Sequence, residues 1–166
     1  MKRNIVLIRH AKSSWTNPLH SDFERTLNER GEYDAPMMGE RLKKLNLRPD
    51  LIISSSAKRA KQTAKRIAAA IGFDKEKIKL EDKLYHCIPA VFGEMIVSLD
   101  DSLQTVFIVA HNPGITDFVN ELSNQFRIDN MPTCGVVAAA IDSAHWSDFN
   151  VINKDVFLFE YPKKSL

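Results

Sequence analysis

The chain has 166 residues, of which 44% are apolar and 27% are charged, a composition typical of folded globular proteins and not of disordered ones. This length predicts one domain over residues 1–166, long enough to bury a core of its own. Lysine and arginine number 23 against 21 aspartate and glutamate, so the net charge is +2, which excludes the strong positive field of a nucleic-acid-binding protein. Any affinity for anions must come from a local site.

The cysteine pattern and the hydropathy pattern bear on the compartment. Cys87 and Cys134 lie far apart and lack the C-x-x-C spacing, so they indicate neither a zinc ribbon nor a disulfide framework. The apolar run at residues 5–8 is too short for a signal peptide, and the longest apolar stretch, CGVVAAAI, is less than half a membrane span. We therefore expect a reduced, cytoplasmic protein with no membrane partner.

Short runs rich in β-branched and aromatic residues alternate with segments in which apolar residues recur every three or four positions. The first pattern is typical of strands and the second of amphipathic helices. In chain order this predicts a strand at residues 4–9, a helix at 29–46, a strand at 50–54, a helix at 57–72, a strand at 77–80, a helix at 89–100, a strand at 105–110, a helix at 114–124, and strands at 135–142 and 155–161.

The helix at residues 57–72 is the clearest, because its alanines and isoleucines share one face and Gly72 follows as a terminating residue. Pro36 either opens or kinks the helix at 29–46. Strands 4–9, 50–54 and 105–110 are nearly continuous apolar runs, as a sheet covered on both faces requires. We therefore predict a three-layer α/β/α fold with a mostly parallel central sheet, in which the last one or two strands can be antiparallel.

Two of the buried strands end on a histidine. Arg9 and His10 close the first run, and His111 follows the run at 105–110. The carboxyl ends of parallel strands meet at one edge of a sheet, so the two histidines converge if their strands are neighbours. The run at 50–54 ends in serines and leads into the helix whose first turn carries Arg59, which we expect at the same edge.

Two histidines and two arginines beside helix starts suit a phosphoryl group, because guanidinium forks and helix-start amides bind phosphate oxygens. Metal binding is the alternative use of paired histidines. Flanking arginines repel a divalent cation, and no carboxylate has a comparable spacing, so we expect neither metal nor cofactor. A neutral imidazole can accept a phosphoryl group. Nearby arginines should keep His10 deprotonated, since like charge disfavours the imidazolium.

The blocks LIRHAKSS, SSSAKRAKQTA and VAHNPGI resemble the three signature blocks of the histidine phosphatase superfamily. DFERTLNERG resembles the D-x-x-R-x-L-x-x-x-G segment of its small bacterial members. The resemblance runs from residue 4 to about 118 and is closest to the SixA-type phosphohistidine phosphatases. It implies a phosphoglycerate mutase-like fold, with the following expected site: His10 as the nucleophile, Arg9 and Arg59 as phosphate-binding arginines, His111 as the second histidine, and Ser13, Ser55 and Asn112 at the rim.

The chain departs from the family pattern in three places. The R-H-G motif reads Arg9-His10-Ala11, and the serine turn at residues 54–56 lacks its proline; both changes are conservative. Many relatives supply a general acid after the third strand. Here Glu81 and Asp82 are the candidates for proton donor, although neither stands in a motif that can be aligned, and a solvated loop charge is the alternative.

A missing strong acid favours a labile N–P bond over an alkyl phosphate, whose leaving group needs a proton donor. The short chain also leaves little sequence for a closing lid. We therefore expect a hydrolase that acts on protein phosphohistidine, with a histidine phosphotransfer domain as partner. The alternatives are a small-molecule phosphomonoesterase of the same superfamily and a non-catalytic phosphate-binding module. A mutase is disfavoured for lack of a clear acid and lid.

Outside these blocks, we interpret His20, His86 and His145 as loop or surface residues, with His20 also a candidate for the rim. Trp15 and Tyr85 are interpreted as packing residues rather than as substrate platforms. We expect residues 162–166 to fray.

Overall fold

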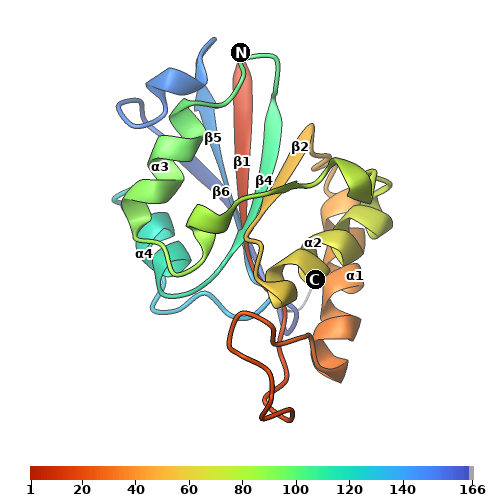
Figure 1. The fold of residues 1–166 in the computed structure, drawn as a ribbon. Helices are drawn as coiled ribbons and strands as arrows, with labels where there is room; N and C mark the ends of the chain where they lie inside the picture. The colour runs from red at the N-terminus through yellow and green to blue at the C-terminus, as the bar shows by residue number, and fades with distance from the viewer. Residues whose placement is uncertain (165–166) are drawn as a thin grey trace.

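The computed structural model describes residues 1–164, which contain a six-stranded sheet between two pairs of α-helices (Figure 1). Within these residues, no helix combines the length and the apolarity needed to cross a bilayer. The elements in chain order are β1 (Lys2–Arg9), α1 (Glu29–Lys44), β2 (Leu51–Ser54), α2 (Lys58–Ile71), β3 (Lys79–Leu80), α3 (Pro89–Val97), β4 (Thr105–Ala110), α4 (Gly114–Glu121), β5 (Val136–Asp142) and β6 (Asp155–Glu160), with 3-10 turns at Lys75–Lys77, Asp82–Leu84 and Trp146–Asp148.

The strand order is β3-β2-β4-β1-β5-β6. Strands β1 to β4 pair in parallel, whereas β5 and β6 are antiparallel. The predicted mostly parallel sheet is therefore confirmed, with β5 antiparallel to β1 and β6 antiparallel to β5. β1 and β4 are direct neighbours, and Arg9 pairs with Ala110 at their carboxyl ends. The residues that follow these two strands, His10 and His111, consequently leave the sheet at the same level.

Successive side chains of each strand point to opposite faces of the sheet, so the core has one part on each face. Ile5 and Leu7 of β1 pack in the core that includes α3 and α4. Val6 and Ile8 face the other way and pack in the core that includes α1 and α2. Because both faces are covered, the central strands are apolar without interruption. The three-layer arrangement is visible in Figure 1, where the two helix pairs flank the sheet.

Several predicted elements differ in their bounds, and the helices expected at 89–100 and 114–124 already end at Val97 and Glu121. The strand expected at 77–80 is limited to Lys79–Leu80, because the Asp74 side chain accepts a hydrogen bond from the Glu76 amide and starts a 3-10 turn over Lys75–Lys77. Pro36 lies inside α1 and does not open it, since the helix begins at Glu29.

The end of the described chain is held against α1. Arg41 donates to the carbonyl of Tyr161 at 2.9 Å and to that of Pro162 at 3.1 Å. Lys164 Nζ donates to the carbonyl of Phe159 at 2.6 Å. The prediction of fraying is therefore wrong for residues 162–164, and Ser165 and Leu166 lie outside the described residues.

Gly31 controls how closely α1 approaches the end of β1. The Asn28 side chain accepts from the Gly31 amide at 2.9 Å and caps the helix, and the Asn28 amide donates to the Lys12 carbonyl at 3.0 Å. A Cβ at position 31 would overlap the Lys12 carbonyl oxygen. Glycine therefore allows the helix start to rest on the backbone that follows His10.

We predict that Gly31→Ala lowers the free energy of unfolding by about 1–3 kcal/mol, because the added methyl group must displace backbone. Urea denaturation measures the change. Glu40→Ala, at an exposed position of the same helix, serves as the control and should change stability by less than about 0.5 kcal/mol. Equal stability of Gly31→Ala and wild type would contradict the close-packing interpretation.

Candidate active site

A cavity of about 420 Å³ opens at the carboxyl ends of β1 and β4. It brings together the residues that the sequence singled out most strongly: Arg9, His10, Arg59 and His111. Ser13 and Asn112 line it as well, as expected for the rim. The other lining residues are Lys12, Trp15, Asp22, Arg25, His86 and Thr133.

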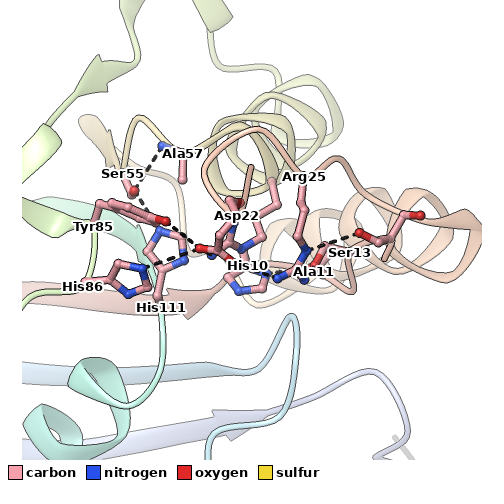
Figure 2. Close-up of polar contacts among 12 residues, drawn as sticks. His10, Ala11, Ser13, Asp22, Arg25, Ser55, Ala57, Tyr85, His86 and His111 are labelled. Atoms are coloured by element: carbon pink, nitrogen blue, oxygen red, sulfur yellow. Dashed lines mark hydrogen bonds and ion pairs between the residues drawn. The ribbon is translucent and has the colours of Figure 1, made fainter. Parts of the chain in front are cut away.

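His10 is 7% exposed and is held on both sides by backbone hydrogen bonds. Its amide donates to the Ala110 carbonyl at 3.1 Å, and its carbonyl accepts from the Cys134 amide at 3.0 Å. The ring Nδ1 lies 2.7 Å from the Ala11 carbonyl (Figure 2). A carbonyl can only accept, so Nδ1 carries the hydrogen and Nε2 keeps its lone pair.

Burial lowers the pKa of His10 well below its ordinary 6.5. The hydrogen bond to Ala11 opposes this effect, while His111, Arg59 and Arg9 add to it in decreasing order. The ring is therefore neutral at pH 7, as expected. The expected cause needs correction, because removal from water contributes more than the charge of the arginines.

His111 faces His10, with ring centroids 5.1 Å apart. Burial and, next, the charge of Arg59 lower the pKa of His111 to about 3. Its Nε2 lies 2.8 Å from Ser55 Oγ, which itself accepts from the Ala57 amide at 3.2 Å. Ser55 can thus donate its own hydroxyl hydrogen to His111. The expectation that Ser55 lies at the rim is wrong, since it is fully buried and supports the ring of His111.

The two predicted arginines are anchored from different elements. Arg9 Nη1 donates to the Met131 carbonyl at 2.8 Å. Arg59, in the first turn of α2, donates through Nη1 to the backbone oxygen of Asp22 at 2.5 Å and through Nη2 to its carboxylate at 3.1 Å. Within residues 1–164, the buried Nε atoms of Arg9 and Arg59 and the Nδ1 of His111 have no hydrogen-bond partner.

Asp22 is the carboxylate of the cavity, and the sequence analysis did not single it out. It accepts hydrogen bonds from Tyr85 Oη at 2.5 Å and from Arg25 Nη1 at 2.8 Å in addition to Arg59 (Figure 2). Burial alone would raise the pKa of Asp22, but the hydrogen bond from Tyr85 and the charge and hydrogen bonds of the arginines lower it to about 2. Asp22 is therefore ionised at pH 7.

Arg25 is a third cavity arginine that the sequence analysis did not single out. Besides Asp22, it donates to Ser13 Oγ and to the Ser14 carbonyl. Both Asp22 and Arg25 occupy the fixed positions of the D-x-x-R segment, so that segment was the available signal. The three-residue spacing allows the pair to form its ion pair at 2.8 Å.

Several residues outside the motif blocks are placed differently from expectation. His86, interpreted as a loop or surface residue, lines the cavity, and its Nε2 lies 3.5 Å from Asp22 Oδ2. Tyr85 packs on His86 with ring centroids 3.9 Å apart and also bonds to Asp22. Trp15 is not a buried packing residue: it is 76% exposed, with the Arg25 guanidinium 3.3 Å from its ring centroid.

The remaining candidates lie elsewhere among the described residues. The Glu81 side chain accepts from the Lys83 amide, and the Asp82 carboxylate accepts from Ser56 Oγ. Neither lines the cavity, so their positions do not support a role as proton donor. His20 is exposed outside the cavity lining, and His145 pairs with Asp101 at 2.8 Å.

The chain is similar to several known proteins. Residues 5–86 match the family described as the histidine phosphatase superfamily (branch 1). A chloroplastic, uncharacterized protein of Arabidopsis thaliana is 30% identical over 132 residues, which are 74% of this chain and 60% of that protein. The mitochondrial serine/threonine-protein phosphatase Pgam5 of Drosophila ananassae is 38% identical over 76 residues, or 46% of this chain and 26% of that one. The chain thus spans less than two thirds of either relative.

Solved structures match over nearly the whole chain. A protein named SixA from Agrobacterium tumefaciens has a TM-score of 0.78 and 26% identity, covering 96% of this chain and 99% of that one. A protein histidine phosphatase SixA in complex with tungstate has a TM-score of 0.82 at 17% identity, with 96% and 97% coverage. The implied phosphoglycerate mutase-like fold is therefore confirmed. The chain is thus similar to the histidine phosphatase superfamily over residues 5–86 and shares the fold of the SixA structures.

Proposed function

We propose that the protein is a phosphatase that passes a phosphoryl group through His10 to water. The observation that carries this proposal is the neutral His10 ring, whose Nδ1–H is bonded to the Ala11 carbonyl at 2.7 Å and whose Nε2 lone pair is therefore available. In the first step Nε2 attacks phosphorus, and the bond to the leaving group breaks. In the second step water attacks phosphorus, the bond to Nε2 breaks, and inorganic phosphate leaves.

The other cavity residues have electrostatic roles in this proposal. Phosphoryl transfer spreads negative charge over the equatorial oxygens, and fixed cations stabilise that charge. Arg9, Arg25 and Arg59 supply the cations. If the Ser55 hydroxyl donates to His111 Nε2, the hydrogen of His111 lies on Nδ1 and can be donated to a phosphoryl oxygen.

We propose protein phosphohistidine, carried on a histidine phosphotransfer domain, as the substrate. The supporting observation is that the carboxylate in the cavity, Asp22, has a pKa lowered to about 2 and so holds no proton for an alkoxide leaving group. An N–P bond has less need of such a donor. The similarity to SixA structures points the same way. A phosphoester is the second candidate, because the relative Pgam5 is named a serine/threonine-protein phosphatase.

Exchange of His10 tests the reaction itself. We expect His10→Ala to lower kcat/KM for 4-nitrophenyl phosphate by at least about 10³-fold. Wild type denatured at alkaline pH during turnover should retain an acid-labile, alkali-stable phosphoryl group that the variant lacks. His20→Ala, at an exposed position outside the cavity lining, is the matched control. Equal rates for wild type and His10→Ala would refute the mechanism and leave a phosphate-binding module.

The nitrogen that leaves an N–P bond is basic and still needs a proton, although a weaker donor than a carboxylic acid suffices, and we assign this donor role to His86. Asp22 is ionised, His10 and His111 are neutral, and the guanidinium groups do not release protons. Lys12 also lines the cavity, but histidine is the residue that most often transfers protons. His86 Nε2 lies 3.5 Å from the Asp22 carboxylate, which can orient the ring toward the cavity.

A series of aryl phosphates tests this assignment. His86→Gln should lower kcat/KM by about 10²-fold for phenyl phosphate but by less than about 10-fold for 4-nitrophenyl phosphate, whose leaving group needs no proton. His20→Gln should lower neither. A loss of equal size for both esters would assign His86 a structural role.

The mechanism requires neutral His10 and His111, and this requirement makes stability depend on pH. In the unfolded chain both rings take up protons below about pH 6.5, whereas in the folded protein His111 remains neutral down to a pKa of about 3. The unfolded state then binds more protons, so stability falls as pH falls through this window. Urea unfolding should show a shallower decline for His111→Asn than for wild type or His20→Asn; parallel curves would contradict the neutral, buried His111.

A further inference from the structure

The segment between β1 and α1 presents apolar side chains to solvent. Figure 1 shows it as the red loop that stands out from the body beyond the carboxyl ends of the central strands. We name residues 14–23 of this segment the entrance loop. Its large apolar residues are Trp15, 76% exposed, Leu19, 90% exposed, and Phe23, 39% exposed. Single exposed apolar residues are common, but a group of them beside a site indicates an interaction surface.

Hydrogen bonds connect residues of the entrance loop to one another and to the rest of the protein. The Leu19 amide donates to the Asn17 side chain at 2.9 Å, and the Thr16 amide donates to Ser14 Oγ at 3.1 Å. At its ends, the Ser14 amide donates to the Thr26 carbonyl at 2.8 Å, and the Phe23 carbonyl accepts from the Lys58 amide at 3.0 Å. Leu19 is thus presented to solvent by a hydrogen-bonded turn, although burial of a leucine side chain would be favourable.

Of the exposed apolar side chains of the entrance loop, one lies at the cavity and another lies outside it. Trp15 lines the cavity and carries the Arg25 guanidinium on one side of its ring. Leu19 does not belong to the lining. A small phosphoester that fills about 420 Å³ would touch Trp15 but would not reach Leu19. A macromolecule whose phosphorylated side chain enters the cavity would cover both.

The charge of the loop decides which macromolecule fits. Asp22 is the one acidic residue of the entrance loop, which contains neither lysine nor arginine, and its carboxylate already pairs with Arg25 and Arg59. Nucleic acids and anionic membranes require clustered cations that this loop lacks. An apolar protein surface is complementary to exposed tryptophan and leucine, and aromatic side chains are typical anchors at such interfaces.

We propose that the entrance loop is the docking surface for the phosphorylated protein, and that Leu19 packs on an apolar patch beside the phosphorylated residue. This inference rests on the proposed phosphohistidine phosphatase activity. It adds that substrate recognition extends beyond the phosphoryl group to the folded surface that carries it.

Two substrates with the same N–P bond separate docking from chemistry. One is an isolated histidine phosphotransfer domain phosphorylated with phosphoramidate, and the other is free phosphohistidine. For Leu19→Ser we expect the ratio of kcat/KM for the domain to kcat/KM for the free amino acid to fall about tenfold relative to wild type. Val151→Ser removes an equally exposed apolar side chain, 88% exposed, outside the entrance loop, and should leave the ratio unchanged.

Each outcome has a defined meaning. A selective fall for Leu19→Ser supports the docking surface. An unchanged ratio in Leu19→Ser, an equal fall in Val151→Ser, or equal loss for both substrates overturns it, while hydrolysis of free phosphohistidine by wild type would still support the proposed function. If wild type hydrolyses aryl phosphates but neither phosphohistidine substrate, the proposed substrate and the docking inference both fail.

Discussion

The parallel pairing of β1 with β4 is the constraint on which the site depends. Because Arg9 pairs with Ala110, the next residue of each strand, His10 and His111, leaves the sheet at the same height. Their rings then meet with centroids 5.1 Å apart without any long loop to position them. The apolar side chains on both faces fix this register, since a shift by one residue would turn each core-facing side chain of β1 to the opposite face.

Burial and charge act together at this edge. Three arginines line the cavity beside two histidines, and a charged imidazole there would be both desolvated and repelled. The histidines are therefore neutral, with the pKa of His111 lowered to about 3, and neutrality is the state that a nucleophilic imidazole needs. Asp22 offsets part of the arginine charge and fixes the orientation of Arg25 and Arg59. The same interactions thus order the cavity and set the protonation of its reactive group.

The parts of this site that could be predicted from sequence are those encoded by local pattern. An apolar run that ends on Arg9 and His10 identifies a strand end, and the three-residue or four-residue spacing of the alanines in α2 places Arg59 in its first turn. His86 and Trp15 gave no such signal, because their positions depend on how loops return to the sheet edge. His86 has a φ of 54°, a left-handed conformation that the residue type does not predict. The hydrogen bond from Tyr85 to Asp22 joins residues 63 positions apart, a separation that no periodicity reveals.

Arg59 contacts Asp22 twice, through the backbone oxygen at 2.5 Å and through the carboxylate at 3.1 Å. A phosphoryl group that binds this guanidinium must share it with an anion that the protein already supplies. When phosphate binds, Arg59 forms a charge-assisted hydrogen bond to phosphate but weakens the one to Asp22. The net gain in binding free energy is the difference between these two bonds. In the proposed reaction, which ends with the release of inorganic phosphate, competition from Asp22 weakens the binding of that product. Asp22 therefore both positions Arg59 in the cavity and favours the dissociation of phosphate from it.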